Sequence, residues 1–271
     1  MKHWTLEQIP WTAFDPARVD PEIVKVIKAA AVVEYNGADY ATYLCRVFSD
    51  SPEFQALIRT WASEEIQHGA ALARWAKLAD PDFDFDASFK RFTDGFKVPV
   101  EAEASVRGTR AGELVARCIV ETGTSSYYAA LNEATEEPVL KQICRNIAAD
   151  ELRHYKLFYA HLDRYLARER LGAWGRLKVA VARIFESEDD ELAFAYFAAN
   201  HPGEDYQRRK YSRAYARRAY KFYRRHHVER GIAMVLKVVG LSPTGRLNRL
   251  LSGIAFRFLE SRARRLAAAN A

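Results

Sequence analysis

A glutamate and a histidine three residues apart occur twice in this sequence, as Glu65 with His68 and as Glu151 with His154. On an α-helix, residues at this spacing project from nearly the same face, so one helix can direct a carboxylate and an imidazole to one point. Carboxylates and imidazoles together suit iron or manganese. We therefore interpret both pairs as candidate metal ligands.

Each pair follows a single glutamate at almost the same distance. Glu34 lies 31 residues before Glu65, and Glu121 lies 30 residues before Glu151. The repeated spacing predicts four helices, of which two contribute one glutamate each and two contribute a Glu-x-x-His pair. Together they would place four carboxylates and two imidazoles around a pair of ions. The predicted metal ligands are Glu34, Glu65, His68, Glu121, Glu151 and His154.

The surroundings of these glutamates argue against ordinary solvated helix faces. Glu34 occurs in AAAVVEYNGADY and Glu121 in VARCIVETGTSSYY, where apolar residues flank the acid at helical spacing. Such a carboxylate points into a core, where an ionised side chain is costly unless it is paired or bound to metal. None of the remaining histidines has a glutamate three residues before it; these are His3, His161, His201, His226 and His227.

The sequence pattern is helical along most of the chain and predicts an all-α fold. Asp20-Pro21 and Ser51-Pro52 each combine a capping residue with a proline at the first helical position, so two helices should begin there and form an antiparallel hairpin. Residues 80–105 are rich in Asp, Pro and Phe and lack a long helical period, which suits the one long crossover of a four-helix bundle. The four long helices are predicted at residues 21–48, 52–78, 109–135 and 137–168.

Charge divides the chain unevenly and suggests three parts. Residues 171–271 hold 20 Lys+Arg against 9 Asp+Glu, whereas residues 1–170 hold 21 against 26. We predict an N-terminal segment at 1–19, a di-metal four-helix bundle at 20–170 and a basic helical extension at 171–271. Residues 207–230 concentrate the basic charge. They fit an amphipathic helix packed on the bundle, or a surface for an acidic protein, a nucleic acid or an anionic membrane, and no recognised nucleic-acid motif accompanies the charge.

The remaining composition indicates a cytoplasmic protein. No stretch reaches the ~18 apolar residues of a membrane-spanning helix, and the first residues, MKHWTLEQIP, lack the apolar region of a signal peptide. Cys45, Cys118 and Cys144 are odd in number and lie in helical pattern, so we expect core packing and no disulfide framework.

Two segments carry a family resemblance. LKQICRNIAADELRHY, at residues 140–155, and WASEEIQHG, at residues 61–69, resemble the ligand helices of the soluble acyl-carrier-protein desaturases, within the ferritin-like di-iron superfamily. This resemblance implies two iron ions per chain, cycling between Fe²⁺ and Fe³⁺, with Glu65 and Glu151 as bridging ligands. It implies terminal carboxylates at Glu34 and Glu121, one imidazole per ion from His68 and His154, and an active-site threonine at Thr124.

Trp61 and Asp150 also match positions near the desaturase site. A metal-bound imidazole usually donates its second N–H to a carboxylate, and Asp150 suits that role. Aromatic residues within a turn of the ligands could line a pocket or pack in the core; these are Tyr35, Tyr127, Tyr128, Tyr155 and Phe158.

The expected function is an O₂-dependent di-iron oxidoreductase that desaturates or hydroxylates an apolar small molecule or a carrier-bound acyl chain. Such an enzyme needs an external electron donor. The expected assembly of the chain is a homodimer. Manganese is the alternative metal. The competing hypothesis is an iron- or peroxide-handling protein of the ferritin or rubrerythrin type, although no rubredoxin Cys-x-x-Cys pair is present. A partner-binding scaffold that retains its ligands is the third hypothesis.

Overall fold

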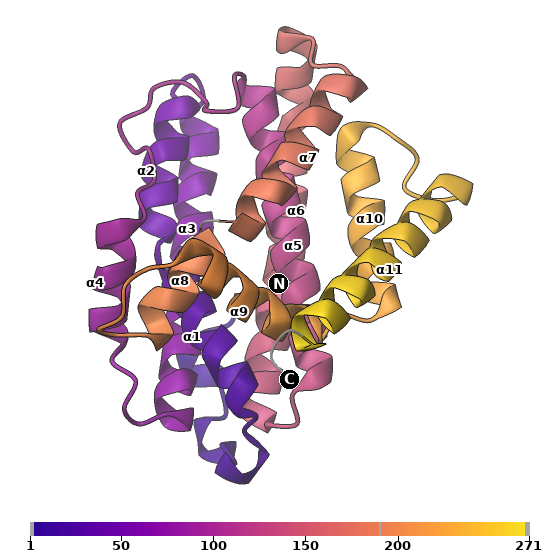
Figure 1. Ribbon diagram of the computed structural model, residues 1–271. Coiled ribbons are helices and arrows are strands. Elements are labelled where there is room, and N and C mark those ends of the chain that lie inside the picture. Colours follow the sequence, from indigo (N-terminus) through magenta and orange to yellow (C-terminus); the bar gives the residue numbers. More distant parts are fainter. Residues whose placement is uncertain (1–2, 190, 269–271) are drawn as a thin grey trace. The chain divides into compact units, whose positions relative to one another are not determined.

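The computed structural model describes residues 3–189 and 191–268. These residues form helices and connecting turns, and no β-strand occurs among them (Figure 1). The predicted all-α fold is thereby confirmed. Short 3-10 turns at Leu6–Gln8, Trp11–Ala13 and Pro16–Arg18 precede the α-helices. The helices are α1 (Pro21–Tyr35), α2 (Gly37–Val47), α3 (Pro52–Ala79), α4 (Phe85–Gly95), α5 (Arg110–Ala134), α6 (Pro138–Glu169), α7 (Ala173–Asp189), α8 (Glu191–Asn200), α9 (Arg208–Tyr220), α10 (Arg225–Val239) and α11 (Arg246–Ala268).

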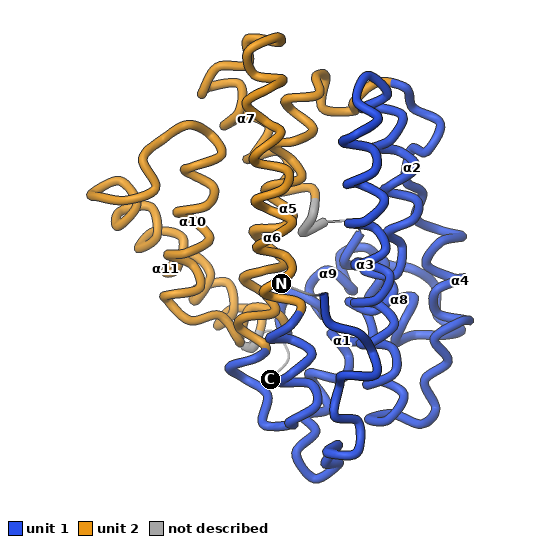
Figure 2. Tube along the Cα trace, turned by 180° about the vertical axis from the view of Figure 1, so that it is seen from behind, with its two compact units in different colours: residues 1–103, 132–146, 188–218 blue, residues 104–131, 147–187, 219–271 orange. Residues whose placement is uncertain are grey.

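The helices group into two compact units, each assembled from separated stretches of the chain (Figure 2). Unit 1 comprises residues 1–103, 132–146 and 188–218. Unit 2 comprises residues 104–131, 147–187 and 219–271. The division at residues 19 and 170 that the sequence suggests stays a prediction.

In unit 1, α1 and α2 pack against α3. Helix α1 begins as predicted, because the Asp20 carboxylate accepts the N–H of Glu22 at 2.7 Å and Pro21 occupies the first helical position. The predicted single helix at 21–48 is wrong in one respect, since it breaks at Asn36 and resumes as α2. The Asn36 N–H donates to the Val33 carbonyl at 3.1 Å, which closes a turn instead of continuing the helix.

Two glycines explain why the hairpin is so closely packed at this break. A Cβ on Gly69 of α3 would lie 2.5 Å from the Tyr35 nitrogen, and a Cβ on Gly37 would lie 2.8 Å from Cβ of Glu65. Real Cβ atoms do not approach neighbours so closely, so only glycine lets the two backbones meet here. This contact brings the end of α1 against the part of α3 that carries Glu65.

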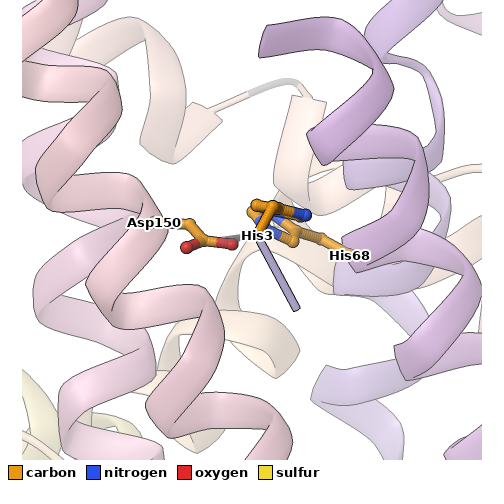
Figure 3. A group of neighbouring side chains, drawn as sticks. All are labelled: His3, His68 and Asp150. Atoms are coloured by element: carbon orange, nitrogen blue, oxygen red, sulfur yellow. The ribbon is translucent and has the colours of Figure 1, made fainter. Parts of the chain in front are cut away.

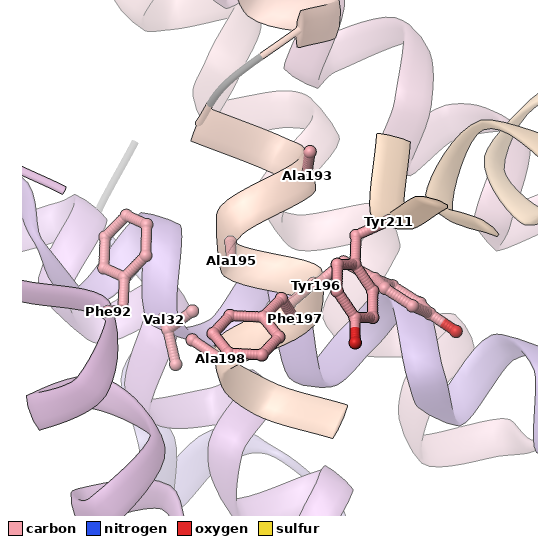
Figure 4. Close-up of a cluster of buried hydrophobic side chains, with 9 residues drawn as sticks. Val32, Phe92, Ala193, Ala195, Tyr196, Phe197, Ala198 and Tyr211 are labelled. Atoms are coloured by element: carbon pink, nitrogen blue, oxygen red, sulfur yellow. The ribbon is translucent and has the colours of Figure 1, made fainter. Parts of the chain in front are cut away.

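The segment predicted to be a crossover contains a helix, α4, which the sequence analysis missed. Asp84 caps it by accepting the Ala87 N–H at 3.0 Å. One face of α4 packs on α8, and α8 also packs on α1. Figure 4 shows the buried side chains that join these elements. They are Ala29 and Val32 of α1, Phe92 of α4, Ala193, Ala195, Tyr196, Phe197 and Ala198 of α8, and Tyr211 of α9.

In unit 2, α5 and α6 run antiparallel over their shared length. The Cys118 thiol lies 3.9 Å from the Tyr155 carbonyl, and the Ser125 hydroxyl lies 3.5 Å from the Ala148 carbonyl. At one end, the Glu169 carboxylate accepts the N–H groups of Arg110 and Ala111 at 3.0 and 2.7 Å, which stabilises the start of α5.

Helix α10 packs on this pair. The Tyr155 hydroxyl donates to the Met234 carbonyl at 2.9 Å, and the Gly231 backbone lies against Ser126 of α5. Helix α11 packs in turn on α10. Among the described residues, no helix is long and apolar enough to cross a membrane.

Candidate metal centre

Three of the predicted ligands form a buried triad in unit 1. Glu34 comes from the last turn of α1, and Glu65 and His68 come from the middle of α3. Nδ1 of His68 lies 3.8 Å from Oε2 of Glu34 and 3.9 Å from Oε2 of Glu65. The His68 side chain is fully buried, and both carboxylates are nearly so. Glu34, Glu65 and His68 thus lie together within unit 1.

A segment outside the predicted bundle holds the His68 ring from one side. The indole of Trp4 stacks on the His68 imidazole, with ring centroids 5.9 Å apart and planes 4° apart. The Gln67 side chain donates to the Trp4 carbonyl at 2.9 Å and so fixes the segment on α3. His3 stacks on Trp4, and its ring lies close to His68 (Figure 3).

Neither His3 nor Trp4 was among the predicted site residues. They lie seventeen or more positions before α1, and nothing in their spacing relates them to the Glu-x-x-His pattern. The only sequence signal is a pair of aromatic rings in an otherwise irregular segment. Their contact with a candidate ligand emerges only from the path of the N-terminal segment across α3.

The second triad lies in unit 2 and has the same composition. Glu121 comes from α5, and Glu151 and His154 come from α6. Nδ1 of His154 lies 3.6 Å from Oε2 of Glu121 and 3.7 Å from Oε2 of Glu151. All three side chains are buried. Thr124, the predicted active-site threonine, lies one turn after Glu121, and its hydroxyl is 2.8 Å from Oε2 of Glu151.

Burial has a large electrostatic effect on this second triad. Desolvation, followed by the nearby charge of Glu151, raises the pKa of Glu121 from 4.5 to about 8. Two carboxylates without a cation therefore do not both ionise readily at neutral pH. A bound cation would remove this conflict, because it favours the charged form of each ligand.

The donor atoms of both triads fit metal ions. Two ligand atoms that each lie about 2.1 Å from a shared ion are about 3 to 4 Å apart. The separations of 3.6 to 3.9 Å between imidazole and carboxylate atoms fall in this range and exceed the length of a hydrogen bond. In each triad the ligand atoms all lie within 4.8 Å of one another. Hard carboxylate oxygens with one imidazole are suited to iron or manganese.

The other predicted neighbours of the ligands are buried or packed against neighbouring side chains. Asp150 is buried and pairs with Arg153 at 2.6 Å, and its predicted role beside a ligand imidazole stays a prediction. The Tyr35 ring packs edge-on against Phe85 and Phe89 of α4, with centroids 5.1 and 5.0 Å away. The remaining predicted site neighbours are buried side chains, namely Trp61, Tyr127, Tyr128, Tyr155 and Phe158.

The cysteines behave as core residues. Cys118 and Cys144 are fully buried and Cys45 is partly buried, and all three are free thiols. Burial raises the pKa of Cys118 and of Cys144 well above the ordinary thiol value, so neither forms a thiolate at neutral pH. Core packing is confirmed for Cys118 and Cys144, and the three thiols form no disulfide.

Residues 39–177 match the fatty acid desaturase family, which is slightly more than half of the chain. The chain belongs to the fatty acid desaturase family. This matched region contains five of the six candidate ligands and Thr124, while Glu34 lies just before it. Membership indicates an oxidoreductase that acts on fatty acids. The comparison with curated proteins gave no match.

Proposed function

We propose that this fatty acid desaturase family member is an O₂-dependent di-iron oxidoreductase, in which each triad binds one iron ion. The observation that supports this most strongly is the repetition of one donor set. Two buried glutamates and one buried histidine converge in each unit, with matching imidazole-to-carboxylate distances. The bridging of both ions by Glu65 and Glu151, which the resemblance implies, is part of this proposal.

Iron held by the two triads would supply redox chemistry with O₂ that side chains lack and that oxidation of an unactivated C–H bond requires. The protein's residues would position and shield the ions. His68 is oriented by the Trp4 indole, and its burial excludes water from the unit 1 triad. Thr124 holds its hydroxyl proton toward Oε2 of Glu151, which fixes the direction of that carboxylate.

The proposed substrate is an acyl chain, free or carrier-bound, and the proposed reaction is desaturation or hydroxylation with electrons from an external donor. This proposal extends the family assignment to a reaction. Its competitor, iron or peroxide handling, would need no organic substrate. Anaerobically reduced protein should therefore be mixed with O₂ in the presence and absence of acyl-CoA and acyl-carrier-protein thioesters. An acyl-dependent change in O₂ consumption and an oxidised acyl product support the oxidoreductase, whereas unchanged Fe²⁺ oxidation and no acyl product favour iron handling.

The metal proposal has a matched pair of variants within one turn of α3. Glu65→Gln replaces a buried ligand, whereas Glu64→Gln changes the partly exposed neighbour that lies near His3. Protein loaded anaerobically with Fe²⁺ should bind two ions per chain by elemental analysis, as should Glu64→Gln. Glu65→Gln should lose both ions if Glu65 bridges them. One ion or none in the parent protein would refute the di-iron proposal.

We also propose that an acidic protein partner binds the basic residues 207–230. Exposed arginines in this range are the positions at which to test it. Arg218 is buried and pairs with Glu22 at 3.0 Å, so it is unavailable to a partner. Arg209 and Arg213 on the same helix are exposed. Reversal of these two charges should weaken carrier-dependent turnover, and added salt should mimic the effect because exposed charges are screened within ~10 Å at 0.1 M. Equal turnover in variant and parent at low salt would refute docking at α9.

A further inference from the structure

Helix α11 exposes a line of large apolar side chains to solvent. Leu247, Leu250, Ile254 and Phe258 are 42%, 61%, 57% and 62% exposed. Their spacings of three, four and four residues place them on one face of the helix over a length of about 16 Å. The opposite face packs on α10 and buries Ser252. We call the four exposed side chains the apolar stripe.

Arginines border the apolar stripe along one edge. Arg246, Arg257 and Arg264 are exposed and are separated by 11 and 7 residues, which are close to whole numbers of helical turns. They therefore form a row parallel to the stripe. Helix α11 contains six arginines, and Glu260 is its single acidic residue. Long arginine side chains beside an apolar surface extend their charged ends to the level of a polar boundary.

We propose that α11 docks on an anionic lipid bilayer, with the apolar stripe inserted at the interface and the arginine row against acidic headgroups. An amphipathic helix with apolar residues on one face and basic residues beside them lies in the plane of the interface, with its apolar face ~5–10 Å deep. A bilayer contacts both parts of this surface. The proposal is independent of the metal site and of the acyl reaction.

Other occupants match the surface less well. An acidic protein would pair with the arginines but would need an apolar groove for four large side chains in line. A second copy of this chain, paired antiparallel through the stripe, would bring the two arginine rows close together, and such like-charge juxtaposition is unfavourable. An apolar surface of this length, rimmed by charge, marks an interaction site because folded proteins seldom leave it in water.

The experiment uses the full-length, metal-loaded protein in vesicle flotation at about 0.1 M salt. Vesicles of phosphatidylcholine with about 30 mol% phosphatidylglycerol should carry the protein upward, and vesicles of phosphatidylcholine alone should carry much less. Equal flotation with both vesicle types, or none with either, would overturn the proposal.

Two pairs of variants assign the binding to α11. Replacement of Leu250, Ile254 and Phe258 by Gln should weaken binding at least ~100-fold, because three inserted apolar side chains are lost. The control replaces the exposed α7 residues Val181, Ile184 and Phe185 by Gln and should bind like the parent. All six positions are exposed, so helicity, melting temperature and iron content should be unchanged.

The charge pair consists of two double variants that change the net charge equally. One is Arg257→Glu/Arg264→Glu on α11, and the other is Arg209→Glu/Arg213→Glu on α9. The α11 double variant should bind anionic vesicles at least about 20-fold more weakly than the parent, whereas the α9 double variant should lose little affinity. Equal losses in the two double variants would show a general charge effect and overturn the assignment to α11. Two further results would overturn the proposal. In one, the parent protein binds no vesicles and forms a dimer that the apolar variant dissociates. In the other, the parent protein binds no vesicles and captures an acidic carrier protein through the stripe.

Discussion

The Thr124 hydroxyl donates a hydrogen bond to Oε2 of Glu151 at 2.8 Å. The same hydroxyl lies 3.3 Å from the carbonyls of Val120 and Glu121, one turn earlier on α5. The shorter bond to the carboxylate is charge-assisted, and such bonds are about twice as strong as neutral ones. Thr124 is thus a link between the helix that carries Glu121 and the helix that carries Glu151.

Removal of this link should alter the reaction and leave the ions in place. Thr124→Val keeps the size of the side chain but deletes the donor, and a hydrogen bond to a charged group is worth about 1.5–3 kcal/mol. We expect iron content to be unchanged and acyl-dependent turnover to fall roughly 10- to 100-fold. The optical spectrum of the oxidised iron should shift, because the direction of the Glu151 carboxylate changes.

Thr124→Ser is the matched control, since it retains the hydroxyl. It should restore most of the turnover and the parent spectrum. If the valine and serine variants are equally impaired, packing of the lost methyl or side-chain shape, and not the hydrogen bond, governs the effect.

The raised pKa of Glu121 predicts how the metal-free protein responds to pH. Burial and the charge of Glu151 raise this pKa from 4.5 to about 8, so the folded protein holds a proton that the unfolded chain releases. The stabilisation that Glu121 contributes is therefore fully present below pH 4.5. It declines as the pH rises above that value and is lost once the pH has passed about 8. Urea unfolding of metal-free protein should show a higher free energy at about pH 5.5 than at about pH 8.

Two measurements test the origin of that pH dependence. Glu121→Gln should flatten the profile, because the amide cannot ionise, whereas Glu136→Gln at an exposed position should leave it unchanged. Metal-loaded protein should show a smaller decline toward high pH, since the cation stabilises the ionised carboxylates. A metal-free protein that becomes more stable between pH 5.5 and 8 would contradict the assignment.

Residue spacing alone places the two members of each Glu-x-x-His pair on one face of a helix. The reason is local: Glu65 with His68, and Glu151 with His154, share a helix face whatever the tertiary fold. The N-caps at Asp20 and Asp84 are local too, although the helix that follows Asp84 was missed because it is short and lies in a Phe-rich connection. The break at Asn36 had a signal in the Asn-Gly pair that follows Glu34, since this dipeptide favours turns.

Contacts between distant segments were not predictable in the same way. The Trp4 ring stacks on His68, and Trp4 belongs to a segment with no periodic sequence pattern. The amino-acid composition of such a segment does not predict which helix it will contact. Arg218 belongs to a basic run that suggests a solvated face, yet it is buried against Tyr196 and Glu22. The number of charges in a segment does not show which of them a neighbouring helix covers.

The buried position of Arg218 predicts an effect on stability. Its guanidinium pairs with Glu22 and lies over the Tyr196 ring, with 5.5 Å to the ring centroid. Arg218→Met should lower the free energy of unfolding by about 1–3 kcal/mol, because a hydrogen-bonded charge partner is lost. Arg213→Met, at an exposed position of the same helix, should change it by less than about 0.5 kcal/mol. Similar denaturant midpoints for both variants would show that the Arg218 pair adds nothing.

The close approach of Gly69 to Tyr35 predicts that one substitution will affect both helix packing and metal binding. A Cβ at position 69 would lie 2.5 Å from the Tyr35 nitrogen, so Gly69→Ala must push the end of α1 away from α3. Because Glu34 precedes Tyr35 and His68 precedes Gly69, the same displacement widens the unit 1 triad. We expect a loss of about 1–3 kcal/mol in the free energy of unfolding and weaker binding of one iron ion.

Gly123→Ala is the control for this variant, because a Cβ there meets no atom within 4 Å. Alanine is favoured over glycine inside a helix by roughly 0.5–1 kcal/mol, so this variant should be slightly stabilised and bind iron like the parent. The comparison uses urea unfolding of the metal-free proteins and anaerobic Fe²⁺ titration of each. A Gly69→Ala protein that gains stability as Gly123→Ala does, with undiminished iron affinity, would show that α1 adjusts freely and that the glycine does not set the geometry of Glu34 and His68.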